Sequence, residues 1–215
     1  MKIKSFSVSN YRSITRAHKI EMHDLTILVG KNNEGKSNII KALSLSIKIL
    51  NSYAMFSKRH HITSSILSRY LDDYGYKWVR DFPVESQQKE KGKKSTKFEL
   101  EFELSEEERK KFNKEVGTRL TTSNFDVTIE IGDNDRAVIK VIKKGSSKIK
   151  DQSLKVCEFI AENLVFNYIP AVRTETQAVR LIEDAISSEL RMVEDNEEYK
   201  KAIATISKLQ KEPLD

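Results

Sequence analysis

Residues 30–37 read Gly30-Lys31-Asn32-Asn33-Glu34-Gly35-Lys36-Ser37, and this stretch decides the fold. It matches the complete phosphate-binding-loop pattern G-x-x-x-x-G-K-S. A short apolar run, Leu25-Thr26-Ile27-Leu28-Val29, leads into the loop and predicts a buried strand. An apolar-periodic run, Asn38-Ile39-Ile40-Lys41-Ala42-Leu43, leads out of it and predicts a helix. Strand, glycine loop and helix in this order predict a phosphate site, because a chance glycine turn would lack these flanks.

The chemistry of such a loop follows from its residue types. Gly30 and Gly35 permit backbone angles that other residues resist, so successive N–H groups can turn inward around a phosphate. The helix that follows adds the positive end of its dipole at the same point. Lys36 can reach the β- and γ-phosphates, and the Ser37 hydroxyl can be a ligand of Mg²⁺. We therefore predict that ATP and Mg²⁺ bind at residues 30–38, namely Gly30, Lys31, Asn32, Asn33, Glu34, Gly35, Lys36, Ser37 and Asn38.

Length and composition limit the class of protein. The chain has 215 residues, 38% hydrophobic and 33% charged, which fits one large domain or one domain with an appendage. The net charge of +6 is compatible with nucleic-acid contact, although many cytosolic proteins share it. No apolar stretch approaches the roughly 18 residues of a membrane span, and no signal-peptide core is present. Cys157 is the only cysteine, so the chain can form no internal disulfide bond. We therefore expect a cytoplasmic protein, in a reducing compartment, and expect Cys157 to be a small core residue.

The first half of the chain predicts two strands before the loop and one helix after it. Residues 2–9 alternate as a half-buried strand does, residues 10–14 form a turn, and residues 19–22 form a second, antiparallel strand. The helix begins at Lys36 and ends near Leu50. Residues 51–84 predict an irregular, partly helical insertion. The helix has an apolar face of core spacing, formed by Ile39, Ile40, Leu43, Ile47 and Leu50.

The second half predicts an antiparallel β lobe followed by helix. Residues 98–104 alternate strictly and have one acidic face, and residues 105–108 are a capping box that opens a helix to about Val116. Strands are expected at 126–131 and 136–142, around the turn 132–135. A helix over 151–163 and a strand over 164–169 follow, with Pro170 ending the strand. Residues 174–211 have the apolar spacing of a packed helix or a short coiled coil, broken near Asn196.

A lysine-rich stretch lies between the insertion and the β lobe. Residues 86–97 hold five lysines against one glutamate and contain no large apolar residue. One interpretation is a contact with the DNA backbone, and the other is a solvated surface loop. The candidate DNA contacts are Lys89, Lys91, Lys93, Lys94 and Lys97.

Three motifs resemble one branch of the phosphate-loop ATPases. The first is Asn10-Tyr11-Arg12-Ser13-Ile14, and the second is the loop spelled G-K-N-N-E-G-K-S-N. The third is Tyr168-Ile169-Pro170-Ala171-Val172-Arg173. Together they resemble the N-terminal ATPase region of the OLD (overcoming lysogenization defect) nucleases, including their Gabija-type phage-defence relatives. The resemblance to RecF and SMC ATPases is looser, and residues 51–160 match in layout only.

The resemblance implies an α/β fold, a partial ABC-type ATPase head with an antiparallel β lobe and a C-terminal helical stalk. The head would be residues 1–173, with the insertion at 51–97 and the β lobe at 98–142, and 174–215 would be a stalk or dimerisation segment. ATP and Mg²⁺ would be the cofactors, and a homodimer or higher homo-oligomer would trap nucleotide between heads. Arg12 and Ser13 would lie near the nucleotide. Arg173 occupies the place of an SMC Q-loop and Gln177 lies four residues beyond it, although Arg173 could equally pair with the following acidic helix.

Several parts of a complete ATPase are missing from the sequence. No apolar strand ends in the Asp-Glu pair of a Walker B segment, in which the aspartate holds Mg²⁺ and the next acid orients water. The L-S-x-G signature and the acidic Toprim cluster of the OLD nucleases are also absent. His60-His61 has no third metal ligand nearby in sequence. The catalytic residues are therefore unknown, and we expect this chain alone to be inactive as an ATPase.

Three functions fit these observations. The first is the ATP-binding N-terminal part of an OLD-like ATP-dependent endonuclease in phage defence or DNA processing, whose nucleotide state controls a fused or separate nuclease module. The second is a RecF- or SMC-like DNA-repair head without a nuclease. The third is a non-catalytic, nucleotide-gated assembly subunit. DNA is the expected partner of the complete protein in the first two, and no membrane contact is expected.

Overall fold

The computed structural model describes residues 1–31, 35–59, 75–88, 94–143 and 152–169. The chain divides into two compact units, Met1–Phe166 and Asn167–Asp215. Every helix and strand named below belongs to the first unit. None of these described helices is both long enough and apolar enough to cross a membrane. The predicted boundary at residue 173 and the predicted stalk fall outside the described residues.

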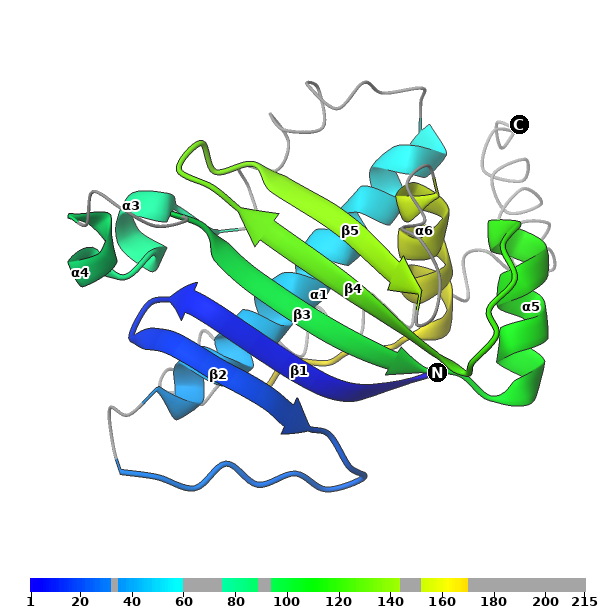
Figure 1. Ribbon diagram of the computed structural model, residues 1–215, viewed down its shortest axis with the longest axis horizontal. Helices are drawn as coiled ribbons and strands as arrows, with labels where there is room; N and C mark the ends of the chain where they lie inside the picture. The colour runs from blue at the N-terminus through cyan, green and yellow to red at the C-terminus, as the bar shows by residue number, and fades with distance from the viewer. Residues whose placement is uncertain (32–34, 60–74, 89–93, 144–151, 170–215) are drawn as a thin grey trace, which may run out of the picture. The chain divides into compact units, whose positions relative to one another are not determined.

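One five-stranded antiparallel sheet forms the centre of the first unit, in the order β2-β1-β3-β4-β5 (Figure 1). The predicted N-terminal strands and the predicted β lobe therefore belong to a single sheet. The join is the pairing of β1 with β3, in which Phe6 lies opposite Leu100 and Val8 opposite Phe98. The strands are β1 (Lys2–Tyr11), β2 (Ile14–Glu21), β3 (Thr96–Glu103), β4 (Asn124–Ile131) and β5 (Ala137–Lys143).

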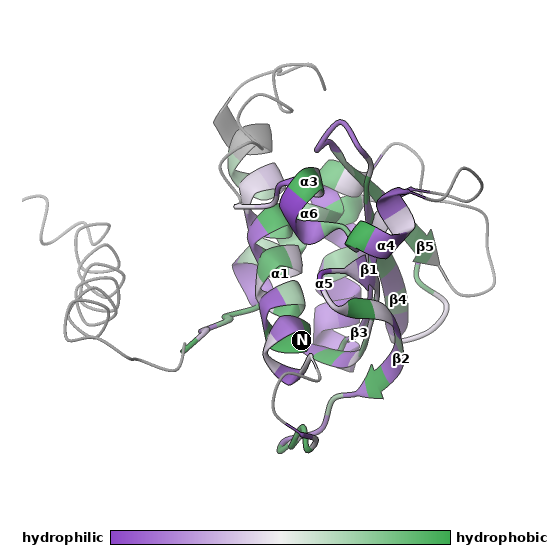
Figure 2. Ribbon diagram, turned by 90° about the vertical axis from the view of Figure 1, so that its left-hand side faces the viewer, coloured by the Kyte–Doolittle hydropathy of each residue, from purple (hydrophilic) through white to green (hydrophobic). Residues whose placement is uncertain are grey.

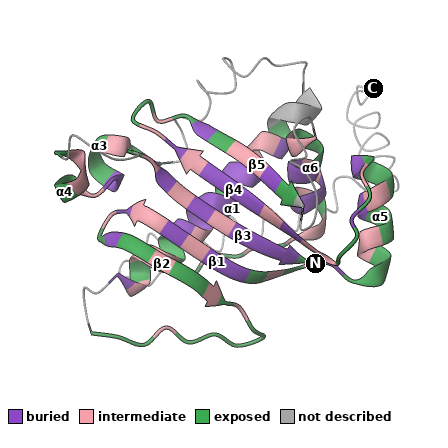
Figure 3. Ribbon diagram, viewed as in Figure 1, coloured by how far each residue is buried: buried purple, intermediate pink, exposed green. Residues whose placement is uncertain are grey.

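The two faces of the sheet differ in polarity, as the alternating sequence predicts. Apolar side chains of β1, β3 and β4 on one face are completely buried, among them Phe6, Phe98 and Ile129. Two helices, α1 (Lys36–Arg59) and α6 (Ser153–Asn163), cover this face (Figure 2). The central strands are accordingly the most buried, whereas β2 at the edge is largely exposed (Figure 3).

Helix α1 is longer than predicted and is buried over a wider arc. Ala42, Ile49 and Leu50 are fully buried, because α1 contacts the sheet as well as α6. The prediction that Ile40 belongs to the core face is wrong, since its side chain is 42% exposed. The Tyr53 hydroxyl donates a hydrogen bond of 2.6 Å to the Ala137 carbonyl and thereby ties α1 to β5. Burial raises the pKa of Tyr53 to about 12.

Helix α5 (Glu106–Val116) confirms the predicted capping box. The Ser105 hydroxyl accepts the Glu108 N–H at 3.2 Å, and the Glu108 carboxylate accepts the Ser105 N–H at 2.8 Å. Gly117 ends the helix with a φ of +73°, the left-handed angle that glycine adopts without steric cost. Phe112 of α5 then packs against Phe125 and Phe159, each with a ring-centroid distance of 5.0 Å.

Two predicted strands are wrong. Residues 25–29 and 164–169 have no regular secondary structure, and no described strand pairs with either segment. Leu25, Ile27 and Val29 are 77%, 72% and 90% exposed, and Val165 is 87% exposed. A strand needs a hydrogen-bonding neighbour, and neither segment pairs with a described strand, even along the outer edges of β2 and β5. Apolar composition predicted the strands, but it could not supply the partners.

The predicted insertion contains two short helices among its described residues. These are α3 (Trp78–Asp81) and α4 (Val84–Gln87), which follow Tyr76 closely. Trp78 and Phe82 stack with ring centroids 5.0 Å apart. Residues 60–74, including His60 and His61, lie outside the described part of the chain. The partly helical character of the insertion is confirmed for residues 75–88.

The aromatic cluster between the sheet and helices α5 and α6 should dominate stability. Phe125 is fully buried, and its ring packs against two others. Its ring centroid lies 5.2 Å from that of Phe102 and 5.0 Å from that of Phe112. We expect Phe125→Ala to lower the free energy of unfolding by about 3–5 kcal/mol, because it removes a buried ring and leaves a cavity. Denaturant unfolding measures the change. The control Val79→Ala removes a 77% exposed side chain and should change stability by less than about 0.5 kcal/mol. Equal effects of both substitutions would contradict the assignment of the core.

Candidate nucleotide-binding site

The end of the glycine loop and the start of α1 form the centre of the candidate site. Gly35 has a φ of +95° and lies directly before the first helical residue, Lys36. The Ile39 N–H donates to the Gly35 carbonyl at 2.9 Å, which closes the first helical turn. No acidic residue lies in this turn, so the positive end of the helix dipole is not neutralised there. Asn32, Asn33 and Glu34 lie outside the described residues.

Lys36 bends back over the loop. Its ammonium group donates hydrogen bonds to the carbonyl oxygens of Gly30 and Lys31. The charged group therefore lies beside Gly30 and Lys31, the first two residues of the motif. Ser37 is exposed at the same helix end. Its predicted role as a Mg²⁺ ligand stays a prediction.

The turn between β1 and β2 contacts the start of α1. Arg12 and Ser13 form a two-residue turn between Tyr11 and Ile14, which pair across the hairpin. The Asn38 amide donates a hydrogen bond of 2.9 Å to the Ser13 hydroxyl. A Cβ atom on Gly35 would lie only 3.4 Å from the same hydroxyl oxygen. The structure thus brings Arg12, Ser13, Gly35 and Asn38 together, although 25 residues separate Ser13 from Asn38.

A buried carboxylate lies next to this turn, and sequence analysis missed it. Asp81 of α3 has no exposed surface, and four N–H groups point at its two oxygens. The Nε of Arg12 donates to Oδ1 at 2.9 Å, and Arg80 donates to both oxygens at 3.1 and 2.6 Å. The backbone N–H of Lys77 donates to Oδ2 at 3.0 Å.

The protonation of Asp81 follows from these contacts. Burial by itself would raise the pKa of Asp81, but the hydrogen bonds from Arg80 and Lys77 and the charges of both arginines outweigh it. The net result is a lowered pKa, so the carboxylate is ionised at neutral pH. The only sequence signal was an Arg-Asp pair in an irregular aromatic segment, which by itself predicts no partner.

A hollow of about 420 Å³ opens between α3 and the start of α1. Arg12, Asn38, Arg80 and Asp81 line it, together with the residues that lead into α4. Its walls therefore include the arginine of the hairpin turn and the asparagine that follows the loop motif. The charges of Arg12, Arg80 and Asp81 add up to +1, which suits an anionic group.

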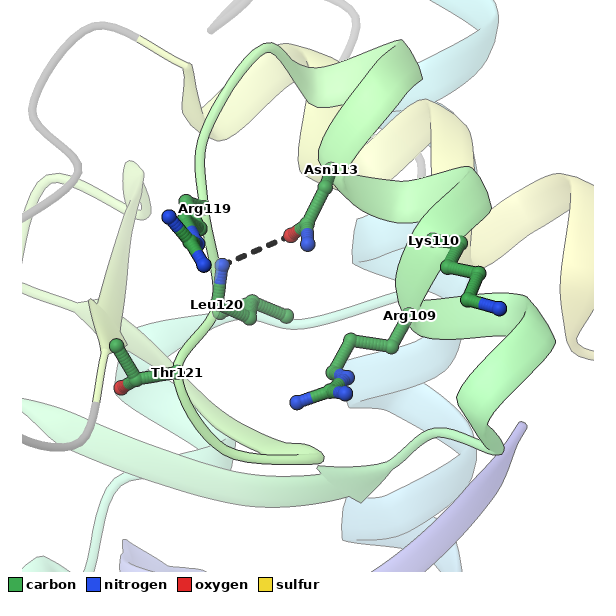
Figure 4. Close-up of a pocket in the computed structure, with 6 residues that line it drawn as sticks. All are labelled: Arg109, Lys110, Asn113, Arg119, Leu120 and Thr121. Atoms are coloured by element: carbon green, nitrogen blue, oxygen red, sulfur yellow. Dashed lines mark hydrogen bonds between the residues drawn. The ribbon is translucent and has the colours of Figure 1, made fainter.

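A second hollow, of about 400 Å³, lies beside α5 and the segment that leads to β4 (Figure 4). Arg109 there is paired with Glu106 at 2.8 Å, which offsets its charge. The Asn113 side chain accepts the Leu120 N–H at 2.8 Å and so holds the segment to α5. Lys110 points away from Arg119 in Figure 4. None of the residues of the glycine loop lines this hollow, so it is separate from the candidate site.

The remaining predicted site residues are only partly described. Arg173, Gln177, Lys89, Lys91 and Lys93 lie outside the described residues. Lys94 donates to the Gln87 carbonyl at 2.8 Å. Lys97 pairs at 2.5 Å with Glu99, which lies two residues further along the same strand, β3. Within the described ranges, no group of three or more His, Cys, Asp or Glu side chains could hold a metal ion.

The glycine-loop motif that ends at the start of α1 is the sequence signature of P-loop nucleotide-binding proteins. A family model described as "AAA ATPase domain" matches residues 1–214, and the chain therefore belongs to this family. AAA ATPase domains generally use ATP with Mg²⁺. No curated protein sequence matches the chain.

One solved structure is similar in outline. It comes from work on ATP-driven dimerization and DNA-stimulated activation of SMC ATPases. The alignment covers 86% of this chain and 99% of that chain, with 12% sequence identity and a TM-score of 0.41. A similarity this low carries no functional argument. The assignment to the OLD branch stays a prediction.

Proposed function

We propose that this chain is the ATP-binding N-terminal part of an OLD-like ATP-dependent endonuclease that acts in phage defence or DNA processing. The nucleotide state of the chain would control a nuclease module that is absent from it. The observation that carries the proposal is the contact of the Arg12–Ser13 turn with the start of α1, directly beside the glycine loop. These two motifs also carry the resemblance to the OLD and RecF/SMC ATPases.

The residues of the site would divide the work of binding a triphosphate. Backbone N–H groups of the loop would surround the β-phosphate, and the dipole of α1 would favour its charge. Lys36 would exchange the carbonyls of Gly30 and Lys31 for β- and γ-phosphate oxygens. Ser37 would be one ligand of Mg²⁺, which neutralises the phosphates during transfer. Arg12 would add a further positive charge near the start of α1, where it shares a hollow with Asn38.

Catalysis would require residues that the described chain does not provide. Phosphoryl transfer needs an aspartate on Mg²⁺ and an acid that orients water, and the sequence contains no Walker B segment. The exposed apolar runs around Ile27 and Val165 support the same conclusion, because exposed apolar segments without strand partners favour association with further strands. We infer that further polypeptide, fused or separate, supplies the missing strands and the acidic residues of the Walker B segment.

The alternative functions differ in the module that would accompany this chain. A RecF- or SMC-like head would be accompanied by a long returning coiled coil, and an OLD-like nuclease by a Toprim cluster of acids. A nucleotide-gated assembly subunit would bind ATP without hydrolysis in the complete complex. The Asn32-Asn33 spelling of the loop and the Ile169-Pro170-Ala171 segment favour the OLD-like function.

The substitution Lys36→Ala tests ATP binding. It removes the one side-chain charge aimed at the β- and γ-phosphates, so we expect affinity to fall about tenfold to a hundredfold, as for a lost charged hydrogen bond. Titration of the purified chain with ATP in a calorimeter measures the change. Lys41→Ala is a matched control, because Lys41 is an exposed lysine of the same helix. Equal affinity of parent and Lys36→Ala would exclude the proposed role of Lys36.

Steady-state phosphate release tests whether this chain alone completes the reaction. We expect no useful turnover, because positioning and charge neutralisation require all the parts of the site together. The measurement compares the parent with Lys36→Ala at saturating ATP and Mg²⁺. Robust hydrolysis by the parent that Lys36→Ala abolishes would reveal a catalytic acid in this chain and contradict the expectation.

We also propose that any DNA contact is to the phosphate backbone and starts at the lysine-rich stretch. Lysines without interleaved aromatic residues suit phosphates rather than base edges. Replacing Lys89, Lys91, Lys93, Lys94 and Lys97 with glutamine should weaken duplex binding and flatten its salt dependence.

The control for this experiment removes the same charge elsewhere. It replaces five exposed lysines with glutamine, namely Lys19, Lys41, Lys48, Lys110 and Lys114. If both quintuple variants bind duplex DNA alike across a salt series, the lysine-rich stretch is only a solvated loop. A loss confined to the first variant supports the proposed contact.

A further inference from the structure

We propose that Asp81 is a positioning residue, which holds the guanidinium group of Arg12 near the start of α1 so that Arg12 binds a phosphate oxygen of ATP. The inference rests on the proposed ATP binding and deepens it. It assigns a role to a residue of the insertion, 44 residues beyond Ser37, that no motif of the sequence includes.

The Arg12 side chain is held from two directions. Its Nε donates to Asp81 Oδ1 at 2.9 Å, and its guanidinium carbon lies 5.4 Å from the centre of the Tyr11 ring. The backbone N–H of Arg12 also donates to the Asp81 carbonyl, at 2.6 Å. Asp81 accepts from the Nε, so this ion pair leaves the two terminal amino groups of Arg12 to other acceptors, of which the Tyr11 hydroxyl is one. A fixed guanidinium loses less conformational entropy when it binds an anion than a mobile one does.

The backbone of Arg12 supports a functional role. Arg12 has a φ of +53°, at the first central position of a two-residue hairpin turn. Glycine, asparagine and aspartate are the usual residues where such a turn needs a left-handed angle, and arginine is strained there. Strained residues concentrate at ligand sites, where the side chain has a use that offsets the strain. A turn that only joined two strands would gain from glycine.

The charges around Asp81 indicate an anionic ligand. Asp81 is completely buried, whereas the side chain of Arg80 is 57% exposed and closes the cluster toward solvent. Arg80 supplies one positive charge that offsets Asp81, which leaves the charge of Arg12 uncompensated within the cluster. Asn38, which follows the loop motif, shares the lining of the same hollow with Arg12. A phosphate bound at the start of α1 would therefore lie close to Arg12, whose charge would attract it.

A double-mutant cycle distinguishes positioning from a purely structural ion pair. The affinity for ATP is measured by calorimetry for the parent, Arg12→Gln, Asp81→Asn and the double variant. If Asp81 acts through Arg12, each single substitution weakens binding by about tenfold and the double variant binds no worse than Arg12→Gln. Additive losses would overturn the inference, as would unchanged affinity of either single variant. Arg16→Gln is the control, because it removes an exposed arginine of the same hairpin.

Two further variants keep the test independent of folding. Asp81→Glu retains the charge and moves it by one methylene. It should therefore weaken ATP binding when Arg12 is present, and it should leave the affinity for ATP unchanged in the Arg12→Gln background. It replaces Asp81→Asn in the cycle if that variant does not fold. Arg12→Gly relieves the turn but also removes one partner of the buried Asp81, so its two effects on the melting temperature oppose each other, and affinity should fall by more than any loss of stability explains. A loss of affinity only in proportion to lost stability would overturn the inference.

The outcomes also separate this inference from the proposed function. No binding of ATP by the parent would overturn both. Binding that Lys36→Ala weakens and Arg12→Gln leaves unchanged would leave the proposed function intact and overturn the role of Arg12 and Asp81. Binding that both substitutions weaken, with non-additive behaviour of Arg12 and Asp81, supports both.

Discussion

The antiparallel pairing of β1 with β3 is the constraint on which the candidate site depends. It joins Lys2–Ser9 to Lys97–Glu103 and so fixes the N-terminal hairpin against the later part of the chain. Thr96 stabilises the end of this pairing near the turn. Its hydroxyl donates a hydrogen bond of 2.6 Å to the Asn10 carbonyl, and it shares a second hydrogen bond, of 2.7 Å, with the Tyr76 hydroxyl. Burial raises the pKa of Tyr76, so this hydroxyl stays protonated. The turn that contains Arg12 begins two residues after Asn10 and is thereby held in place.

Sequence analysis predicted the features that depend on neighbouring residues. The capping box at Ser105 and Glu108, the hairpin around Gly132 and the start of α1 at Lys36 all arise from contacts within a few residues, so local patterns suffice. It failed where a contact spans a long separation. Nothing local reveals that Asp81 meets Arg12 69 residues earlier, or that β1 prefers β3 as its second neighbour.

The two wrong strands follow from the same distinction. The run Leu25–Val29 has the composition of a buried strand, yet composition states only that a segment would gain from burial. Its alternate side chains Leu25, Ile27 and Val29 are exposed, because the segment pairs with none of the five described strands. The sequence was thus informative about the chemistry of the segment and uninformative about the partner that would bury it.

Electrostatics connects the insertion to the loop. A buried carboxylate is costly unless hydrogen bonds and opposite charges compensate it, and Asp81 receives both from Arg80 and Arg12. Arg80 offsets the charge of Asp81, and Arg12 lines the same hollow as Asn38 near the start of α1, whose dipole no acidic residue of the first turn neutralises. Lys36, the first residue of this helix, adds a positive charge of its own. A helix start with an unneutralised dipole and a lysine favours an anion, and the phosphate of the proposed nucleotide would supply it.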